Sequence, residues 1–471
     1  MVVVVVLAVL AVVAVLVAAH WYVWRRLVRD TTAAPGPARR LGTVAIILLP
    51  VLSVGAMTSS RSEAPFLLQQ ALAWPGFLWL ATLLYLVLAL GVAEAGRPLL
   101  RRCLARRDAT ENTPEPTTPT EPREPFATGT TPSATAETTP GAVEKTPTAA
   151  ETTPAAAGTT PGTATVTATA STPVSAPPST TASTASTASA ATAAPAGPSR
   201  RLFVSRVVGG AAATAGLATV GYGTYGVLRG PRVKRVTVPL AKLPRSAHGF
   251  RIAVVSDIHL GPILGSGHSR RIVHAINSTR PDLIAVVGDM VDGSVQDLGP
   301  AAAPLAGLEA RHGSFFVTGN HEYFSGAAAW VDHVRELGMR PLENERVEIA
   351  GFDLAGVNDI AGESEGDGPD FVKALGDRDP ARASVLLAHQ PVVIHDAVRH
   401  GVDLQLSGHT HGGQVWPGSL LAGFANPTVA GLERYEDTQL YVSRGAGAWG
   451  PPVRVGAPSD ITVVELASRQ A

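Results

Sequence analysis

The chain has 471 residues, with 38 basic and 38 acidic side chains, so its formal net charge is zero. This balance argues against a whole-chain role in nucleic-acid binding, which usually requires a basic surface. The single cysteine, Cys103, excludes a disulfide framework within the chain and any zinc site made of cysteines alone. A metal ion here would need His, Asp, Asn or Glu ligands.

Four apolar segments in the first half of the chain predict membrane-spanning helices. Residues 2–19 are continuously apolar and lead into aromatic residues and arginines, as is typical of a helix that ends at a membrane surface. A cleaved signal peptide is the alternative, but no basic residue precedes this apolar run. The other segments are residues 41–57, 77–95 and 202–228, of which the last is rich in Gly and Ala.

The arginines predict the orientation of these helices. One arginine cluster lies between the first and second segments and another follows the third. In contrast, the loop between the second and third segments, residues 58–76, contains a single arginine, Arg61. By the positive-inside rule, both arginine-rich loops face the cytoplasm. We therefore expect a multi-pass protein of the cell membrane whose C-terminal domain lies on the extracytoplasmic side.

The composition changes sharply after a predicted membrane region at residues 1–107. Residues 108–199 are a tract of Thr, Ala, Pro and Ser that cannot bury enough apolar surface to fold, which predicts a disordered linker. The motif S-R-R-L-F-V then begins at Ser199 and is similar to a twin-arginine export signal. Residues 200–230 are accordingly either a fourth transmembrane helix or a twin-arginine signal-anchor. Both alternatives place the following domain in the same compartment.

From residue 232 to residue 471, short apolar runs alternate with helix-like stretches. The runs at 251–255 and 283–287 are rich in β-branched residues, and residues 268–279 have a helical pattern, which predicts an α/β fold. Alternating stretches farther along the chain, such as 347–357, indicate additional sheet. We expect a two-sheet β-sandwich flanked by helices, preceded by the α-helical transmembrane region.

Polar side chains follow directly after the apolar runs of this domain. Because ligands bind at the carboxyl ends of strands in α/β sheets, these side chains are expected to meet at one edge. Each short motif alone more often marks a turn or a structural histidine, but the ordered set is hard to explain by chance. The candidates are Asp257, His259, Asp289, Asn320, His321, His389, His409 and His411.

This ordered set resembles the signature of the calcineurin-like metallophosphoesterase superfamily, D-x-H, GD-x-x-D, GNH-D/E, H and GH-x-H. The sequence GHTHGGQ through Gln414 and the tail from Ser443 to Arg454 are most similar to the membrane-associated bacterial branch. The resemblance covers about residues 236–466 and excludes the membrane region and the linker. In this chain the motifs read Asp257-Ile258-His259, Gly288-Asp289-Met290-Val291-Asp292, Gly319-Asn320-His321-Glu322, His389 and Gly408-His409-Thr410-His411.

The resemblance implies two divalent metal ions, and mixed imidazole and oxygen ligands fit Mn, Fe or Zn better than Ca. A metal-bridging hydroxide would attack the phosphorus of a phosphodiester or phosphomonoester. His321 is the implied catalytic residue, which protonates the leaving oxygen or stabilises the phosphate charge. The implied ligands are Asp257, His259, Asp289 and His411 for one metal, and Asp289, Asn320, His389 and His409 for the other, with Asp289 bridging.

Other residues have supporting roles in this interpretation. Asp292 and Glu322 are expected to hold loops or to orient the histidines, and Arg444 and Arg454 either contact phosphate or serve in packing. The expected partners are a membrane and a phosphate-ester substrate, with a lipid or cell-envelope component indicated by the membrane tether, and no nucleic acid. The alternative function is a non-catalytic envelope binding or sensory protein that keeps the fold.

Overall fold

The computed structural model describes residues 2–33, 36–59, 62, 64–111 and 200–470. The predicted linker falls almost entirely on residues 112–199, outside the described ranges.

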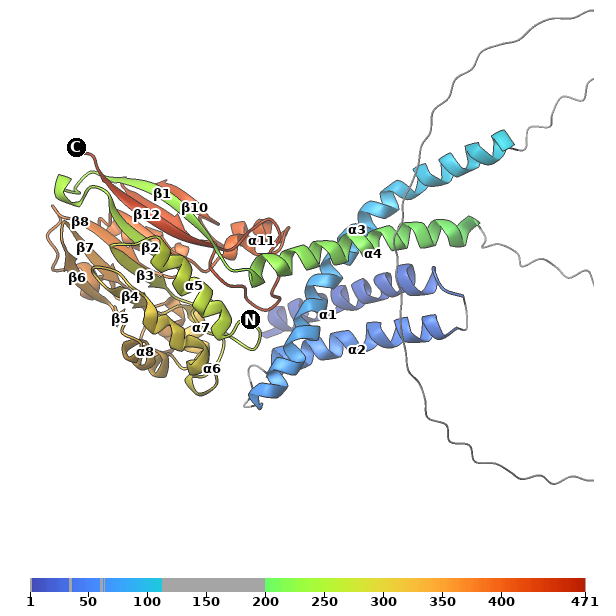
Figure 1. Ribbon diagram of the computed structural model, residues 1–471, viewed down its shortest axis with the longest axis horizontal. Coiled ribbons are helices and arrows are strands. Elements are labelled where there is room, and N and C mark those ends of the chain that lie inside the picture. The colour runs from blue at the N-terminus through green and yellow to red at the C-terminus, as the bar shows by residue number, and fades with distance from the viewer. Residues whose placement is uncertain (1, 34–35, 60–61, 63, 112–199, 471) are drawn as a thin grey trace, which may run out of the picture. The chain divides into compact units, whose positions relative to one another are not determined.

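Four of the described helices are long and apolar enough to cross a membrane, and they coincide with the four predicted segments. The third begins before the predicted start because Gln69, Gln70 and Pro75 interrupt the apolar run without ending the helix. In Figure 1 the second and third helices meet at the end of the bundle nearest the β-rich domain, where the fourth helix also ends. The helices are α1 (Val2–Val23, extended by a π-helical turn at Trp24–Arg29), α2 (Pro37–Ser59), α3 (Phe66–Glu111) and α4 (Arg200–Leu228).

Small residues let α2 and α3 approach closely. A Cβ added to Gly76 of α3 would lie 2.6 Å from the carbonyl oxygen of Leu52 in α2. The Ser53 hydroxyl donates a hydrogen bond of 2.7 Å to the Gly76 carbonyl across the same contact. Close backbone approach and interhelical hydrogen bonds are the interactions that associate helices in an apolar solvent, where the hydrophobic effect is absent.

Two six-stranded sheets make up the domain that follows α4. The first contains, in spatial order, β1 (Arg232–Leu240), β12 (Asp460–Ser468), β2 (Phe250–Val255), β3 (Leu283–Val287), β4 (Ser314–Val317) and β5 (Arg340–Pro341). The second contains β10 (Gly431–Tyr435), β11 (Thr438–Val442), β9 (Leu404–Ser407), β8 (Ala383–Leu387), β7 (Phe352–Gly356) and β6 (Glu345–Ile349). Strands β2 to β5 run parallel, as do β7, β8, β9 and β11.

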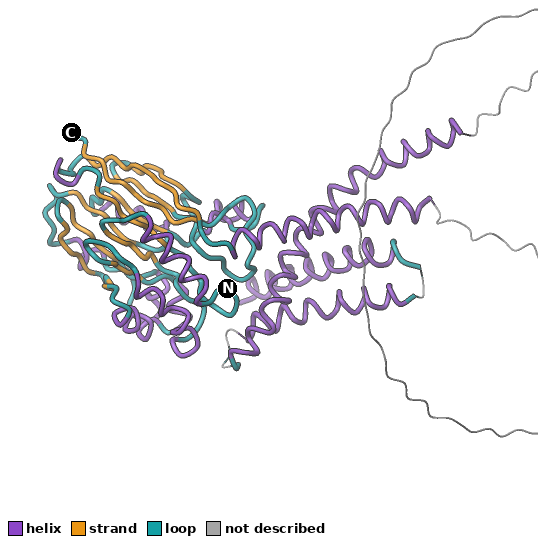
Figure 2. The backbone as a smooth tube through the Cα atoms, viewed as in Figure 1, coloured by secondary structure: helices purple, strands orange, loops and turns teal. Residues whose placement is uncertain are grey.

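Helices cover the outer face of each sheet (Figure 2). The first sheet packs against α5 (Ser266–Ser278), α6 (Val295–Ala302) and α8 (Ala327–Glu336), and the second against α9 (Phe371–Leu375) and α10 (Ile394–Arg399). Two further helices, α7 (Asn320–Ser325) and α11 (Gly418–Ala425), follow strand ends. Short 3₁₀ turns occur at Arg245–Ala247, Ala303–Gly307, Ile360–Glu365, Pro391–Val393 and His411–Gly413.

Alternation along β3 shows how the layers are filled. Leu283, Ala285 and Val287 point into the core between the sheets, whereas Ile284 and Val286 pack on the helices. All five are buried because the strand is covered on both faces, and this accounts for its continuous apolar sequence. The predicted sandwich flanked by helices is therefore confirmed.

A substitution at Val385 of β8 tests how much the core between the sheets contributes to stability. Val385 is fully buried there, whereas Val372 of α9 is 71% exposed. We expect Val385→Ala to lower the free energy of unfolding by about 2 kcal/mol, because losing two buried methyl groups leaves a cavity. The melting temperature should fall by about 4–8 °C. Val372→Ala is the matched control, with an expected change below about 0.5 kcal/mol. Equal shifts for both variants would contradict this core.

Candidate metal centre

Five strands from both sheets end at one edge, and the candidate residues follow them. Strand β2 leads to Asp257 and His259, β3 leads to Asp289, and β4 leads to Asn320 and His321 at the start of α7. From the second sheet, β8 leads to His389, and β9 leads to His409 and His411. Their donor atoms form compact groups, namely Asp257 with His259 and His411, Asp289 with His389 and His409, and His259 with Asp289 and His321.

The first group gathers two imidazoles and a carboxylate. Nε2 of His259 lies 3.0 Å from Nε2 of His411, and the latter nitrogen lies 3.4 Å from Oδ1 of Asp257. In the second group, Nε2 of His389 lies 3.1 Å from Oδ2 of Asp289. Asn320 joins this group, since its Oδ1 lies 3.0 Å from Nδ1 of His409.

Asp289 stands between the two groups. Its Oδ2 atom is 3.7 Å from Nε2 of His259 and 3.1 Å from Nε2 of His389. Burial alone would raise the pKa of Asp289, but the imidazoles of His389, His259 and His321 hold it well below its ordinary value. Asp289 is therefore a carboxylate that stays ionised and faces both groups.

Contacts on the far side of the His389 and His259 imidazoles orient these two rings. Nδ1 of His389 lies 2.8 Å from the Val287 carbonyl, which only accepts, so this nitrogen carries the hydrogen and Nε2 is left for the centre. Nδ1 of His259 lies 2.8 Å from Asp292 Oδ1, which has the same effect. Nε2 of His389 is buried and lies 3.1 Å from Oδ2 of Asp289, but it makes no well-aligned hydrogen bond to the residues that the structure describes. A cation would satisfy it.

The backbone at these positions is unusual. Asp257, His259, Asp289, His409 and His411 have φ angles between 49° and 71°, in the left-handed region. Non-glycine residues rarely adopt it, and each instance costs about 1–3 kcal/mol unless its surroundings enforce it. Five of the eight candidates share this feature, and such strain concentrates at functional sites.

Two glycines leave room for the carboxylates. A side chain at Gly319 would overlap the carboxylate of Asp289, and one at Gly408 would overlap that of Asp257. The glycines of the GNH and GH motifs are thus required by close approach of the backbone to the acidic groups. The same approach lets the backbone N–H of His409 donate a hydrogen bond of 2.9 Å to Asp257.

Asp292 links two histidines of the site. Its Oδ1 lies 2.8 Å from Nδ1 of His259 and 2.7 Å from Nδ1 of His321. Burial lowers the pKa of His321, but the hydrogen bond to Asp292 together with the charges of Asp292, Asp289 and Glu322 raises the pKa to about 9. The predicted orienting role of Asp292 agrees with these contacts.

The donor set fits divalent metal ions. Imidazole nitrogens combined with carboxylate and amide oxygens are typical ligands of first-row transition metals. Burial raises the pKa of Asp257, and carboxylates around His389 raise the pKa of that histidine well above its ordinary value despite burial. Several carboxyl groups buried close together raise the pKa of their neighbours in this way. A bound cation would compensate the negative charge of these carboxylates.

Arg454 proves to be a structural partner of His411. It is 4% exposed, and its guanidinium donates to the carbonyls of Gly447 and His411 at 2.7 Å and 3.0 Å. It also lies 3.0 Å from Nδ1 of His411, which must accept because a guanidinium only donates. Burial, followed by the neighbouring charges of His259 and Arg454, lowers the pKa of His411 well below its ordinary value, so the ring is in the neutral form that metal ions bind. Arg444 runs beside Gly412.

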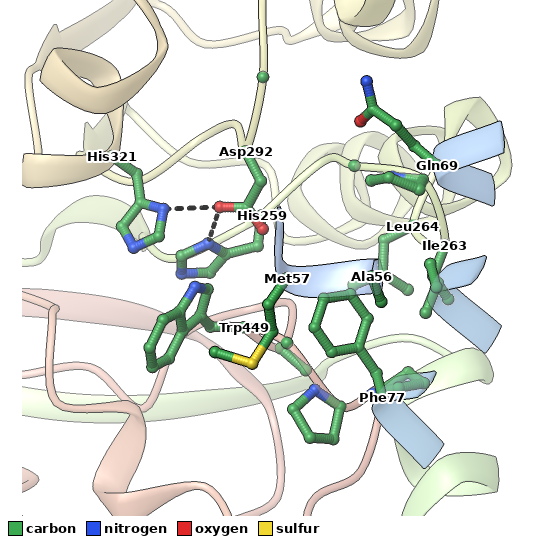
Figure 3. Close-up of a pocket in the computed structure, with 18 of the residues that line it drawn as sticks. Ala56, Met57, Gln69, Phe77, His259, Ile263, Leu264, Asp292, His321 and Trp449 are labelled. Atoms are coloured by element: carbon green, nitrogen blue, oxygen red, sulfur yellow. Dashed lines mark hydrogen bonds and ion pairs between the residues drawn. The ribbon is translucent and has the colours of Figure 1, made fainter. Parts of the chain in front are cut away.

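Residues that sequence reasoning missed surround His321. Phe324 and Trp449 are 73% and 54% exposed, and their rings lie 5.4 Å and 5.8 Å from the imidazole. A cavity of about 570 Å³ opens beside them and is also lined by α2 and α3 (Figure 3). The aromatic residues next to the GNHE motif and before the Pro451-Pro452 pair could have been recognised in the sequence, whereas no local pattern shows that α2 and α3 line this cavity.

Glu322 ties the turns after β3 and β4 together. It is fully buried, and its carboxylate accepts hydrogen bonds from the backbone N–H groups of Asp289, Met290 and Gly319 at 2.7–2.9 Å. Burial, and then the nearby Asp289 charge, raise the pKa of Glu322 to about 7. The predicted loop-holding role agrees with these contacts.

Removing this carboxylate should destabilise the domain. We expect Glu322→Ala to lower the free energy of unfolding by about 3 kcal/mol or more, because three buried N–H groups lose their acceptor. Thermal unfolding in excess chelator measures this effect without a contribution from metal binding. Glu365→Ala, at an exposed position, is the control and should leave the melting temperature unchanged. A melting temperature for Glu322→Ala equal to that of the control would refute the bracing role.

Comparisons with known proteins point to the same region of the chain. The family model described as calcineurin-like phosphoesterase matches residues 250–413, which include all eight candidates. A Danio rerio protein named as a transmembrane protein with a metallophosphoesterase domain is 38% identical over 259 residues, covering 52% of this chain and 59% of its own length. A Helicobacter pylori metallophosphoesterase is 39% identical over 256 residues, covering 53% of this chain and 68% of its own length.

Among solved structures, a dimetal phosphatase from Danio rerio is 12% identical, with a TM-score of 0.33, and covers 47% of this chain and 93% of its own. The match to the zebrafish transmembrane relative spans less than two thirds of that relative, so the activity of the whole protein does not follow from it. The sequence matches alone, with the H. pylori protein covered over more than two thirds of its length, show that the chain belongs to the metallophosphoesterase family.

Proposed function

We propose that the protein is a membrane-anchored phosphoesterase that uses two divalent metal ions to hydrolyse phosphomonoesters or phosphodiesters. The observation that carries this proposal is the pair of donor groups with Asp289 between them. A shared carboxylate offsets the repulsion between two cations, which is the arrangement that two-metal phosphoryl chemistry requires.

The proposed ligands follow the two groups. Mn, Fe or Zn suits the mixture of nitrogen and oxygen donors. When bound, the two ions would activate a water molecule and neutralise charge on the phosphate. One ion would be held by Asp257, His259, Asp289 and His411, and the other by Asp289, Asn320, His389 and His409.

His321 is the proposed catalytic residue. It lines the cavity beside the donor groups, and Asp292 holds its Nδ1 atom. The ring is thereby fixed, and its Nε2–H is available to donate a hydrogen bond to the phosphate or a proton to the leaving oxygen. The carboxylate of Asp292 stabilises the protonated form of His321 and also holds the ring of His259 in position.

The full chain, depleted with chelator and then reloaded with Mn, Fe or Zn, tests the proposal. We expect hydrolysis of chromogenic phosphate esters only after metal is restored. Asp289→Asn should lose at least about 10²-fold in kcat/KM, because the shared ligand is weakened. His321→Ala should lose about 10²–10⁴-fold on an alkyl ester and less on a nitrophenyl ester, whose leaving group needs less protonation.

The outcomes separate catalysis from binding. Glu365→Ala serves as the surface control and should match the wild type. Equal losses for His321→Ala on both leaving groups would exclude proton donation by this residue. A folded protein that binds two metal ions and hydrolyses neither a monoester nor a diester would overturn the phosphoesterase and favour a binding or sensory protein.

The proposed membrane arrangement rests on the four apolar helices and the arginine clusters. The clusters at residues 25–40 and 97–107 favour a cytoplasmic location for one end of the bundle. At the other end, α11 exposes Leu420, Leu421 and Phe424, and no charged residue occurs from 415 to 431. An exposed apolar helix of this kind suits the interface of a bilayer. We accordingly place the domain on the extracytoplasmic side.

The single cysteine allows this orientation to be tested. Cys103 is exposed near the predicted cytoplasmic end of α3. In intact cells, a membrane-impermeant maleimide should leave it unlabelled until the cells are lysed. The same reagent should label intact cells that carry Cys103→Ser with Ser364→Cys, since Ser364 is exposed on the domain. Labelling of Cys103 and not of the introduced cysteine would reverse the proposed orientation.

A further inference from the structure

We infer that the site takes phosphate esters of an alkyl or isoprenyl chain, and that this chain lies in the cavity between the metal centre and helices α2 and α3. The inference rests on the proposed phosphoesterase function and adds a substrate class to it. It comes from the shape and chemistry of one cavity.

The cavity has a polar end and an apolar end. At the polar end it reaches His259, Asp292 and His321, where the phosphate of a substrate would lie. At the other end its wall is made of Met57, Phe77 and Leu80 from α2 and α3. Figure 3 shows the linked side chains of the site on one side and Phe77 on the other. An ester that bridges the two ends must therefore be amphiphilic.

The apolar end offers little for a polar group to bond to. Gln69 is a polar side chain of the α3 wall, and its amide already donates to the Ala64 carbonyl at 2.9 Å. Ile263 and Leu264 close the wall from the loop after β2. The hydroxyls of a sugar or nucleoside would lose water here without gaining partners, whereas a hydrocarbon chain would gain by leaving water.

Trp449 marks the passage between the two ends. Its ring lies 5.8 Å from that of His321, and in Figure 3 it lies next to both the histidines and Met57. A chain leaving a phosphate at His321 would pass this exposed indole before reaching Phe77. The volume of about 570 Å³ falls within the range of sites that enclose small ligands, about 300–1,000 Å³, so a chain of several carbons has room.

The apolar wall also belongs to the membrane region. Both α2 and α3 are long and apolar enough to cross a bilayer, so the cavity adjoins the place where an amphiphile would partition. Such a substrate can present its phosphate to the domain while its chain stays among apolar side chains. A soluble phosphate ester gains nothing from this wall.

The test compares two esters with similar leaving groups, ethyl phosphate and dodecyl phosphate, on the full chain in phosphatidylcholine nanodiscs loaded with the activating metal. Phe77→Gln places an amide in the apolar wall. Leu67→Gln is the matched control on the same helix, at a position 79% exposed and outside the cavity. Partition of an ester into the lipid affects both variants equally. The ratio of their kcat/KM values for that ester therefore measures the contribution of the cavity wall at Phe77.

For dodecyl phosphate, we expect Phe77→Gln to have a kcat/KM about tenfold or more below that of Leu67→Gln, since each buried methylene is worth roughly fourfold in binding. For ethyl phosphate the two variants should agree within about twofold, which also shows that Phe77→Gln is folded. Leu80→Gln, on the same wall, should repeat this pattern.

Other outcomes would overturn the inference in distinguishable ways. Hydrolysis of ethyl phosphate together with equal effects of Phe77→Gln and Leu67→Gln on both esters would refute the chain site and leave the phosphoesterase standing. Failure of the wild type to hydrolyse either of these esters, a chromogenic monoester or a chromogenic diester with any metal would remove the proposed function and the inference with it. Calorimetry with dodecylphosphonate, which is not hydrolysed, adds a readout independent of turnover, and Phe77→Gln should weaken its binding by a similar factor.

Discussion

The close approach of backbone to buried carboxylates at the strand ends is the constraint on which the site depends. The backbone at Gly319 and Gly408 lies so close to the carboxylates of Asp289 and Asp257 that neither position has room for a side chain. In turn, Asp289 accepts a hydrogen bond from the backbone N–H of His321 and Asp257 accepts one from that of His409. Left-handed backbone at both aspartates turns their side chains into this space. The acidic groups thus fix the loops, and the loops fix the acidic groups. Strain at these positions is tolerated because both sheets hold them.

This constraint also explains why two sheets are needed. Asp289 comes from the first sheet and His389 from the second, and their side chains lie 3.1 Å apart. The core between the sheets sets that distance, so packing far from the site determines whether the two donor groups meet. Glu322 acts close to the same place, because its carboxylate accepts backbone hydrogen bonds from the turns that follow β3 and β4 in the first sheet.

The sequence predicted the features that are local. Strands such as 283–287 end in polar residues, and their order along the chain was enough to foresee the α/β sandwich and the eight side chains at its edge. It did not predict the cavity wall, because Met57 and Phe77 meet His321 across more than two hundred residues of chain. It left the role of Arg454 open, since a guanidinium in a loop looks the same whether it faces phosphate or a histidine. Long-range packing decides such cases.

The apolar helices and the β-rich domain belong to one compact unit, so the proposed membrane anchor would be packed against the domain. The Tyr85 hydroxyl donates a hydrogen bond of 3.0 Å to the Trp416 carbonyl, and Val453 packs against Ala81 and Val220 of α3 and α4. A domain on a long tether would sample many positions, whereas these contacts fix one. In the proposed function, the apolar helices would contribute a wall of the cavity as well as attachment to a membrane. Selection among phosphate esters would thus depend on what the membrane region presents as much as on the metal ligands.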